Sequence, residues 1–65
     1  MAMSLLRLPQ VRLRTGLSRS EIYRRMALGE FPQKVSLGAR AVGWVDSEID
    51  SFISDRIKLS RMAVT

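Results

Sequence analysis

Apolar residues recur at helical spacing in three stretches of the chain, and two short extended stretches separate the second from the third. The clearest helical signal covers residues 17–29, where Ile22 and Met26 are four positions apart and share one face. Ser18 is a good N-cap, and Glu21 three residues later completes the capping-box pattern. Gly29 is a natural stop. The stretch therefore predicts a short, capped amphipathic helix.

The other side of this helix is basic. At 100° per residue, an arc beside and opposite the apolar pair carries Arg19, Ser20, Tyr23, Arg24 and Ala27. Glu21 lies off this arc, and four-residue spacing pairs it with Arg25. Tyr23 adjoins Ile22, so its ring is expected either to pack or to contact a phosphate.

A second short helix is predicted just before it. Pro9 suits the first position of a helix, and Gly16 ends the pattern. Its inner stripe is Leu8, Val11 and Thr15, with Leu13 on the opposite side. Two helices around a tight glycine turn make a helix-turn-helix arrangement.

The next segment predicts a β-hairpin. Residues 34–37 alternate polar and apolar, residues 38–41 form a turn, and residues 42–45 are a second apolar run. Arg40 lies at the tip. A basic hairpin after a helix-turn-helix is a wing, and its tip can contact phosphates or enter a minor groove. A solvated turn residue is the alternative for Arg40.

A last helix opens at Asp46 and Ser47, with early acids that suit the positive end of its dipole. Its apolar stripe is Val45, Ile49, Phe52, Ile53 and Ile57, and Trp44 and Phe31 are expected to complete the core. The predicted organisation is thus a flexible lead at residues 1–5, a winged helix-turn-helix at residues 6–57 and a fraying tail at residues 58–65. The fold class is mainly α with a small β-hairpin.

Residue supply argues against catalysis. The 65 residues include no cysteine and no histidine, and the six carboxylates are scattered. The usual general base and metal ligands are therefore missing, so we expect a protein that is not an enzyme and holds no metal or cofactor.

The charge distribution indicates an anionic partner. The net charge is +5, and residues 1–40 hold eight basic and two acidic residues, against three and four in residues 41–65. Double-stranded DNA is the expected partner of the basic half. No apolar run approaches a membrane span and no signal peptide is recognised, so a cytoplasmic protein is expected.

Together these residues resemble a known family, the AlpA-type phage and prophage transcriptional regulators, which are related to excisionases and to the winged-helix domain of the MerR group. The matching residues are Leu6-Arg7-Leu8, Val11, Thr15-Gly16-Leu17-Ser18-Arg19-Ser20, Ile22-Tyr23, Gly29, Phe31-Pro32, Leu37-Gly38, Arg40, Val42-Gly43-Trp44 and Glu48-Ile49. Phe52-Ile53 stands where the family often has a tryptophan, a departure that concerns packing more than function.

The resemblance implies a sequence-specific DNA-binding regulator with the second helix in the major groove and the wing on the backbone or in the minor groove. The candidate DNA-binding residues, from the pattern and the resemblance together, are Arg12, Arg14, Arg19, Ser20, Tyr23, Arg24, Lys34 and Arg40. Arg12 and Arg14 are included because the first helix of such a pair crosses the backbone.

Two other functions remain open at this point. One is a recombination directionality factor, or excisionase, that bends DNA at an attachment site and meets a phage integrase. The other is a protein-binding inhibitor of a host regulator, with its partner at Leu13 or the C-terminal tail. No dimerisation helix is evident, so we expect a monomer in solution, with cooperative contacts on DNA open.

Overall fold

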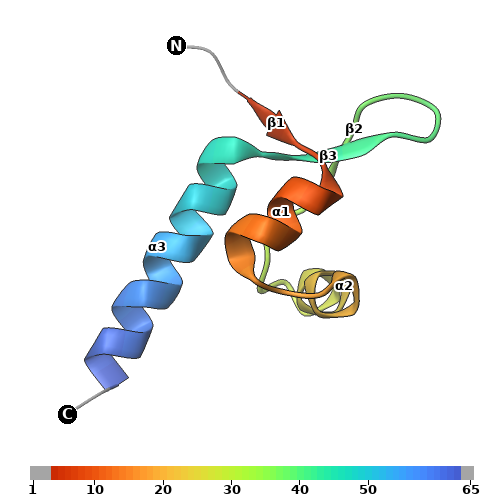
Figure 1. The fold of residues 1–65 in the computed structure, drawn as a ribbon. Helices are drawn as coiled ribbons and strands as arrows, with labels where there is room; N and C mark the ends of the chain where they lie inside the picture. The colour runs from red at the N-terminus through yellow and green to blue at the C-terminus, as the bar shows by residue number, and fades with distance from the viewer. Residues whose placement is uncertain (1–3, 64–65) are drawn as a thin grey trace.

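The computed structural model describes residues 4–63, which form three helices and three short strands around one small core (Figure 1). In chain order the elements are β1 (Leu5–Leu6), α1 (Leu8–Thr15), α2 (Arg19–Ala27), β2 (Val35–Ser36), β3 (Val42–Val45) and α3 (Asp46–Ala63). The predicted fold class, a mainly helical winged helix-turn-helix, is confirmed.

Local hydrogen bonds define the ends of α1 and α2. The Arg7 N–H donates to Gln10 Oε1 at 2.9 Å, and α1 ends at Gly16, whose φ of 73° lies in the left-handed region. Ser18 Oγ accepts from the Glu21 N–H at 3.2 Å, which forms the Ser18 half of the predicted capping box. Helix α1 thus ends at the predicted glycine, and α2 begins at the predicted serine cap.

The sheet is antiparallel with the order β1-β3-β2. The predicted hairpin forms, with Val35 opposite Gly43. Strand β1 corrects the sequence analysis, which placed Leu5 in a flexible lead. Leu5 pairs with Val45, because the far edge of β3 has unpaired backbone groups that a short strand can satisfy. Residues 1–3 of the predicted lead lie outside the described residues.

The core of the described residues collects one buried side chain from each helix, one from β3 and one from the loop after α2. Val11, Ile22, Phe31, Trp44 and Ile49 are buried, as the spacing predicts. The Trp44 indole N–H donates to the Pro32 carbonyl at 3.1 Å, so its only polar atom is satisfied. This core lies directly behind α2 and holds that helix against the sheet.

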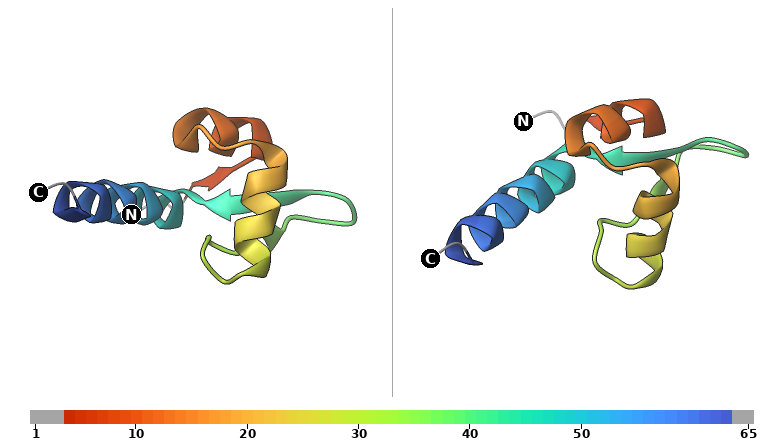
Figure 2. Two further views of the ribbon diagram at one scale, coloured as in Figure 1. Left: turned by 90° about the horizontal axis from the view of Figure 1, so that it is seen from below. Right: turned by 60° about the horizontal axis from the view of Figure 1, so that its bottom comes forward.

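Helix α3 extends well beyond this core and points away from the wing (Figure 2). The predicted inner stripe is therefore wrong at Ile57, which is 44% exposed although Ile49 is fully buried. Helical spacing alone cannot tell where the facing surface ends, and the last turns of α3 run past α1 (Figure 1). The helix continues to Ala63, through most of the predicted tail.

Gly43 occupies a crowded place in the middle of the sheet, and a substitution there should be destabilising. A Cβ at Gly43 would lie 3.0 Å from Leu37 Cδ1 and 3.1 Å from the Leu6 carbonyl oxygen. Since the Leu6 oxygen belongs to the backbone of β1, that strand would have to move. We expect Gly43→Ala to cost about 1–3 kcal/mol of unfolding free energy, measured by thermal denaturation. Ser54→Ala, at an exposed position of α3, is the control and should leave the Tm unchanged. An unchanged Tm for Gly43→Ala would contradict the close packing of β1 against β3.

Candidate nucleic-acid interface

Helix α2 buries Ile22 and turns its basic face outward. Arg19, Ser20 and Arg24 are all exposed, and the Arg24 side chain is 60% exposed. Figure 2 shows α2 on the outside of the molecule, with the wing beside it. The structure therefore brings these three predicted residues together on one accessible surface.

Tyr23 lies at the boundary between this surface and the core. Its ring meets Trp44 edge-on, with the centroids 6.4 Å apart, and it packs against the buried cluster. Arg19 Cζ lies 5.2 Å from the Tyr23 centroid, and Lys34 Nζ lies 5.0 Å from it. Both cations are within the range of a cation–π contact. The ring thus packs, and it also gathers two of the predicted DNA-binding cations.

Glu21 is paired with a different residue than expected. Arg24 Nε donates to Glu21 Oε1 at 2.7 Å, and Arg24 Nη2 donates to Glu21 Oε2 at 3.1 Å. The predicted pair with Arg25 is therefore wrong, and Arg25 is instead half-buried, with its Nε shielded from solvent. Sequence reasoning left Glu21 out of the site, although three-residue spacing to Arg24 is a recognised pairing signal.

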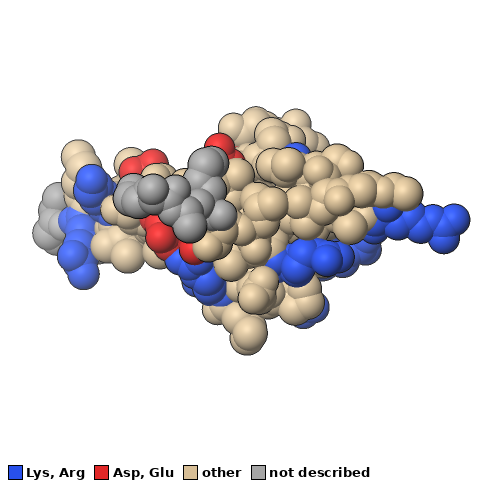
Figure 3. Space-filling model, turned by 90° about the horizontal axis from the view of Figure 1, so that it is seen from above, with Lys and Arg blue, Asp and Glu red and all other residues tan. Residues whose placement is uncertain are grey.

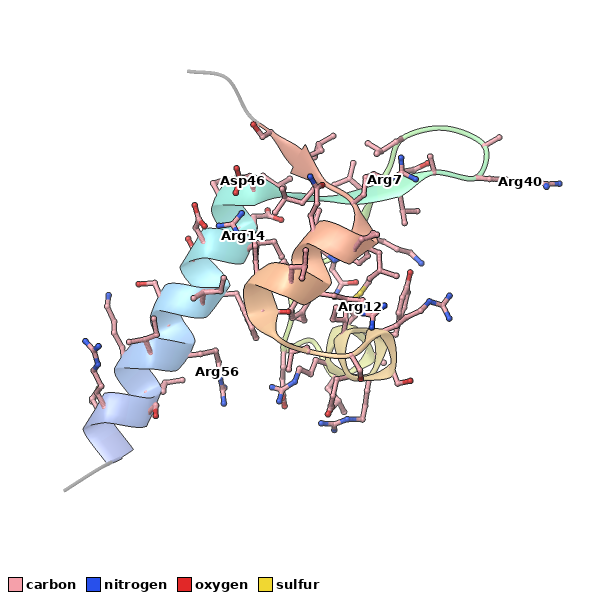
Figure 4. The ribbon with its side chains drawn as sticks, viewed as in Figure 1. Arg7, Arg12, Arg14, Arg40, Asp46 and Arg56 are labelled. Atoms are coloured by element: carbon pink, nitrogen blue, oxygen red, sulfur yellow. The ribbon has the colours of Figure 1, made fainter. Side chains whose placement is uncertain are left out.

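The wing carries Arg40 at its tip. The Leu37 N–H donates to the Ala41 carbonyl at 2.7 Å and closes the loop. Arg40 is exposed and points away from the body of the protein (Figure 4). Lys34 stands before β2, near the base of the wing, where it contacts Tyr23.

The two arginines predicted on α1 have different surroundings. Arg12 is exposed, whereas the Arg14 guanidinium forms ion pairs with Asp46 and Asp50 of α3. Figure 4 shows Arg14 directed toward Asp46. Arg14 thus links α1 to the first turns of α3.

Charge is unevenly distributed over the molecule. The space-filling view shows cationic side chains toward the tip of the wing and at the C-terminal end of α3, with the acidic ones between these two ends (Figure 3). Within residues 4–63, no group of acidic residues is arranged to hold a metal ion, and no helix is long and apolar enough to span a membrane.

Comparison with known proteins identifies relatives over most of the chain. The sequence model of the family described as prophage CP4-57 regulatory protein (AlpA) matches residues 4–57. The uncharacterized protein ORF88 of Enterobacteria phage P4 is 48% identical over 52 residues, which are 80% of this chain and 59% of that protein. The DNA-binding transcriptional activator AlpA of Escherichia coli K12 is 41% identical over 64 residues, which are 89% of this chain and 91% of that protein. The chain therefore spans less than two thirds of the phage relative and nearly all of the bacterial one.

Proposed function

Since this chain belongs to the AlpA family of prophage regulatory proteins, which are DNA-binding regulators and not enzymes, we propose that it is a sequence-specific regulator of transcription. Helix α2 enters the major groove, and the wing contacts the backbone or the adjacent minor groove. The observation that carries this proposal is the exposed face of α2, where Arg19, Ser20 and Arg24 lie together. All three side chains can donate hydrogen bonds to base edges or phosphates.

The roles follow from the position of each group. The first turns of a recognition helix meet base edges, so Arg19, Ser20 and Arg24 are the residues that read sequence. Tyr23, on the same helix, and Lys34, which lies against its ring, contact the flanking phosphates. Arg40, at the tip of the wing, contacts the DNA backbone or the minor groove beyond the reach of α2.

The direct test is selection of bound sites from random double-stranded DNA, followed by Kd measurements on the selected site and a scrambled one at one salt concentration. A sequence-specific regulator should bind its site about a thousandfold or more tightly than the scrambled probe. Equal affinities would refute the proposal. Strong bending together with cooperative binding to repeated sites would instead support a directionality factor that works with an integrase.

Arg12 and Arg14 provide a matched pair of substitutions on α1. We expect Arg12→Ala to weaken binding to both probes by the same factor, because a phosphate contact carries no sequence information. Arg14→Ala should instead lower the stability of the fold by about 0.5–1 kcal/mol and leave affinity nearly unchanged, since its partners are on α3. Fluorescence anisotropy and thermal denaturation of both variants check this. A larger loss of affinity in Arg14→Ala than in Arg12→Ala would show that Arg14 leaves its ion pairs to bind DNA.

Arg40 gives a test of the wing. Arg40→Ala should weaken binding to the selected site by about two- to fivefold at moderate salt, the usual range for one solvent-exposed ionic contact. The Tm should not change, because the side chain points into solvent. Ala39→Ser, at the same tip, is the control. If affinity and Tm both match the wild type, Arg40 is a solvated turn residue and the wing contacts DNA elsewhere.

A further inference from the structure

The Glu21–Arg24 pair uses one edge of the guanidinium and leaves the other open. Nε and Nη2 of Arg24 donate to the two carboxylate oxygens of Glu21, whereas Nη1 takes no part in this fork. A guanidinium has five N–H donors in a plane, and the fork uses two of them. The end of the group, formed by Nη1 and the second N–H of Nη2, can therefore donate to another pair of acceptors at the same time.

Guanine offers such a pair of acceptors. Its O6 and N7 atoms face the major groove at a spacing that matches two parallel guanidinium donors. We propose that Glu21 is a positioning residue, which holds Arg24 so that the open end of its guanidinium reads a guanine. This inference rests on the proposed function of α2 as the recognition helix.

The geometry favours positioning over a purely local role for Glu21. Its backbone N–H is already capped by Ser18 Oγ, while its carboxylate is directed to Arg24. An unrestrained arginine at the same place has many rotamers, and it can also reach phosphates. Fixing one rotamer before binding lowers the entropy cost of the base contact, and the carboxylate repels phosphates nearby. The first effect raises affinity for the correct site relative to other DNA, whereas the second lowers affinity for all DNA.

The test uses two variants of Glu21 and a control that matches the change in charge. Glu21→Gln removes the carboxylate charge, and Glu21→Asp keeps the charge but shortens the side chain by one methylene. Glu48→Gln makes the same charge change in the first turn of α3, where the side chain is exposed and lies outside α2. Each protein is titrated with the selected and scrambled probes at one salt concentration, and its Tm is recorded.

We expect both Glu21 variants to lower the ratio of specific to scrambled affinity by about three- to fivefold, which is the range for one well-formed exposed pair. Glu21→Gln should also bind the scrambled probe more tightly, whereas Glu21→Asp should not. Glu48→Gln should leave the ratio unchanged. In an Arg24→Ala background the Glu21 substitutions should have no further effect on the ratio, because the residue they position is gone.

A modified base identifies the contact. At the position where Arg24→Ala relaxes the base preference, 7-deazaguanine lacks the N7 acceptor and should weaken wild-type binding but not that of Arg24→Ala. The inference would be overturned if the ratio of specific to scrambled affinity were the same in both Glu21 variants as in the wild type and in Glu48→Gln. It would also be overturned if the Glu21 substitutions changed this ratio equally in the wild-type and the Arg24→Ala backgrounds. A wild type that binds both probes alike would overturn the proposed function itself.

Discussion

Trp44→Ala is expected to unfold much or all of the protein at room temperature. Trp44 is fully buried, and its ring is the largest side chain in the core. Replacing a buried tryptophan with alanine costs about 3–5 kcal/mol, because the contacts are lost and the cavity refills only in part. A domain of this size has a stability of only about 5 kcal/mol, so the loss is comparable to the whole.

The position of Trp44 makes the effect reach the DNA-binding surface. Its indole N–H donates to the Pro32 carbonyl, and its ring packs edge-on against the ring of Tyr23. Without it, α2 loses the surface that orients its basic face. Circular dichroism and thermal denaturation should show loss of the cooperative transition, with loss of DNA affinity in parallel. Leu13→Ala, at a side chain that is 85% exposed, should leave both unchanged. A cooperative transition near the wild-type Tm for Trp44→Ala would contradict this account of the core.

The second large effect is the dependence of affinity on salt. We expect the logarithm of the binding constant to fall with the logarithm of the salt concentration with a slope near −5. Raising salt from about 50 mM to about 200 mM should then weaken binding roughly a thousandfold. The expectation follows from the cations that remain available once Arg14 is engaged with α3. They are the other predicted DNA-binding cations, Arg12, Arg19, Arg24, Lys34 and Arg40, and each brings a positive charge among the phosphates whether it contacts a phosphate or a base.

The slope can be checked residue by residue. Each phosphate contact contributes about −0.9 to it, so Arg12→Ala should bring the slope closer to zero by about one. Arg14→Ala is the control and should leave the slope unchanged. A wild-type slope near zero would contradict nucleic-acid binding, and an equal change in both variants would return Arg14 to the interface.

Local signals in the sequence determined most of the fold. The caps at Ser18 and Gly16 act on their own neighbours, so they mark the ends of α1 and α2 without knowledge of the rest of the chain. The phase of a helix is also local. For this reason the buried position of Ile22 and the exposed positions of Arg19 and Arg24 could be predicted.

The tertiary structure decided what depends on residues that are far apart in sequence. Leu5 becomes part of a strand only because β3 presents an open edge to it. Arg14 is drawn into ion pairs only because α3 passes beside it. Ile57 is exposed because α3 extends beyond the surface against which it packs. The spacing of apolar residues within the helix cannot show where that surface ends. Glu21 pairs with Arg24 and not with Arg25, which the tertiary packing half-buries. Periodicity and capping are properties of a few adjacent residues, whereas pairing and burial depend on which surfaces the folded chain brings together.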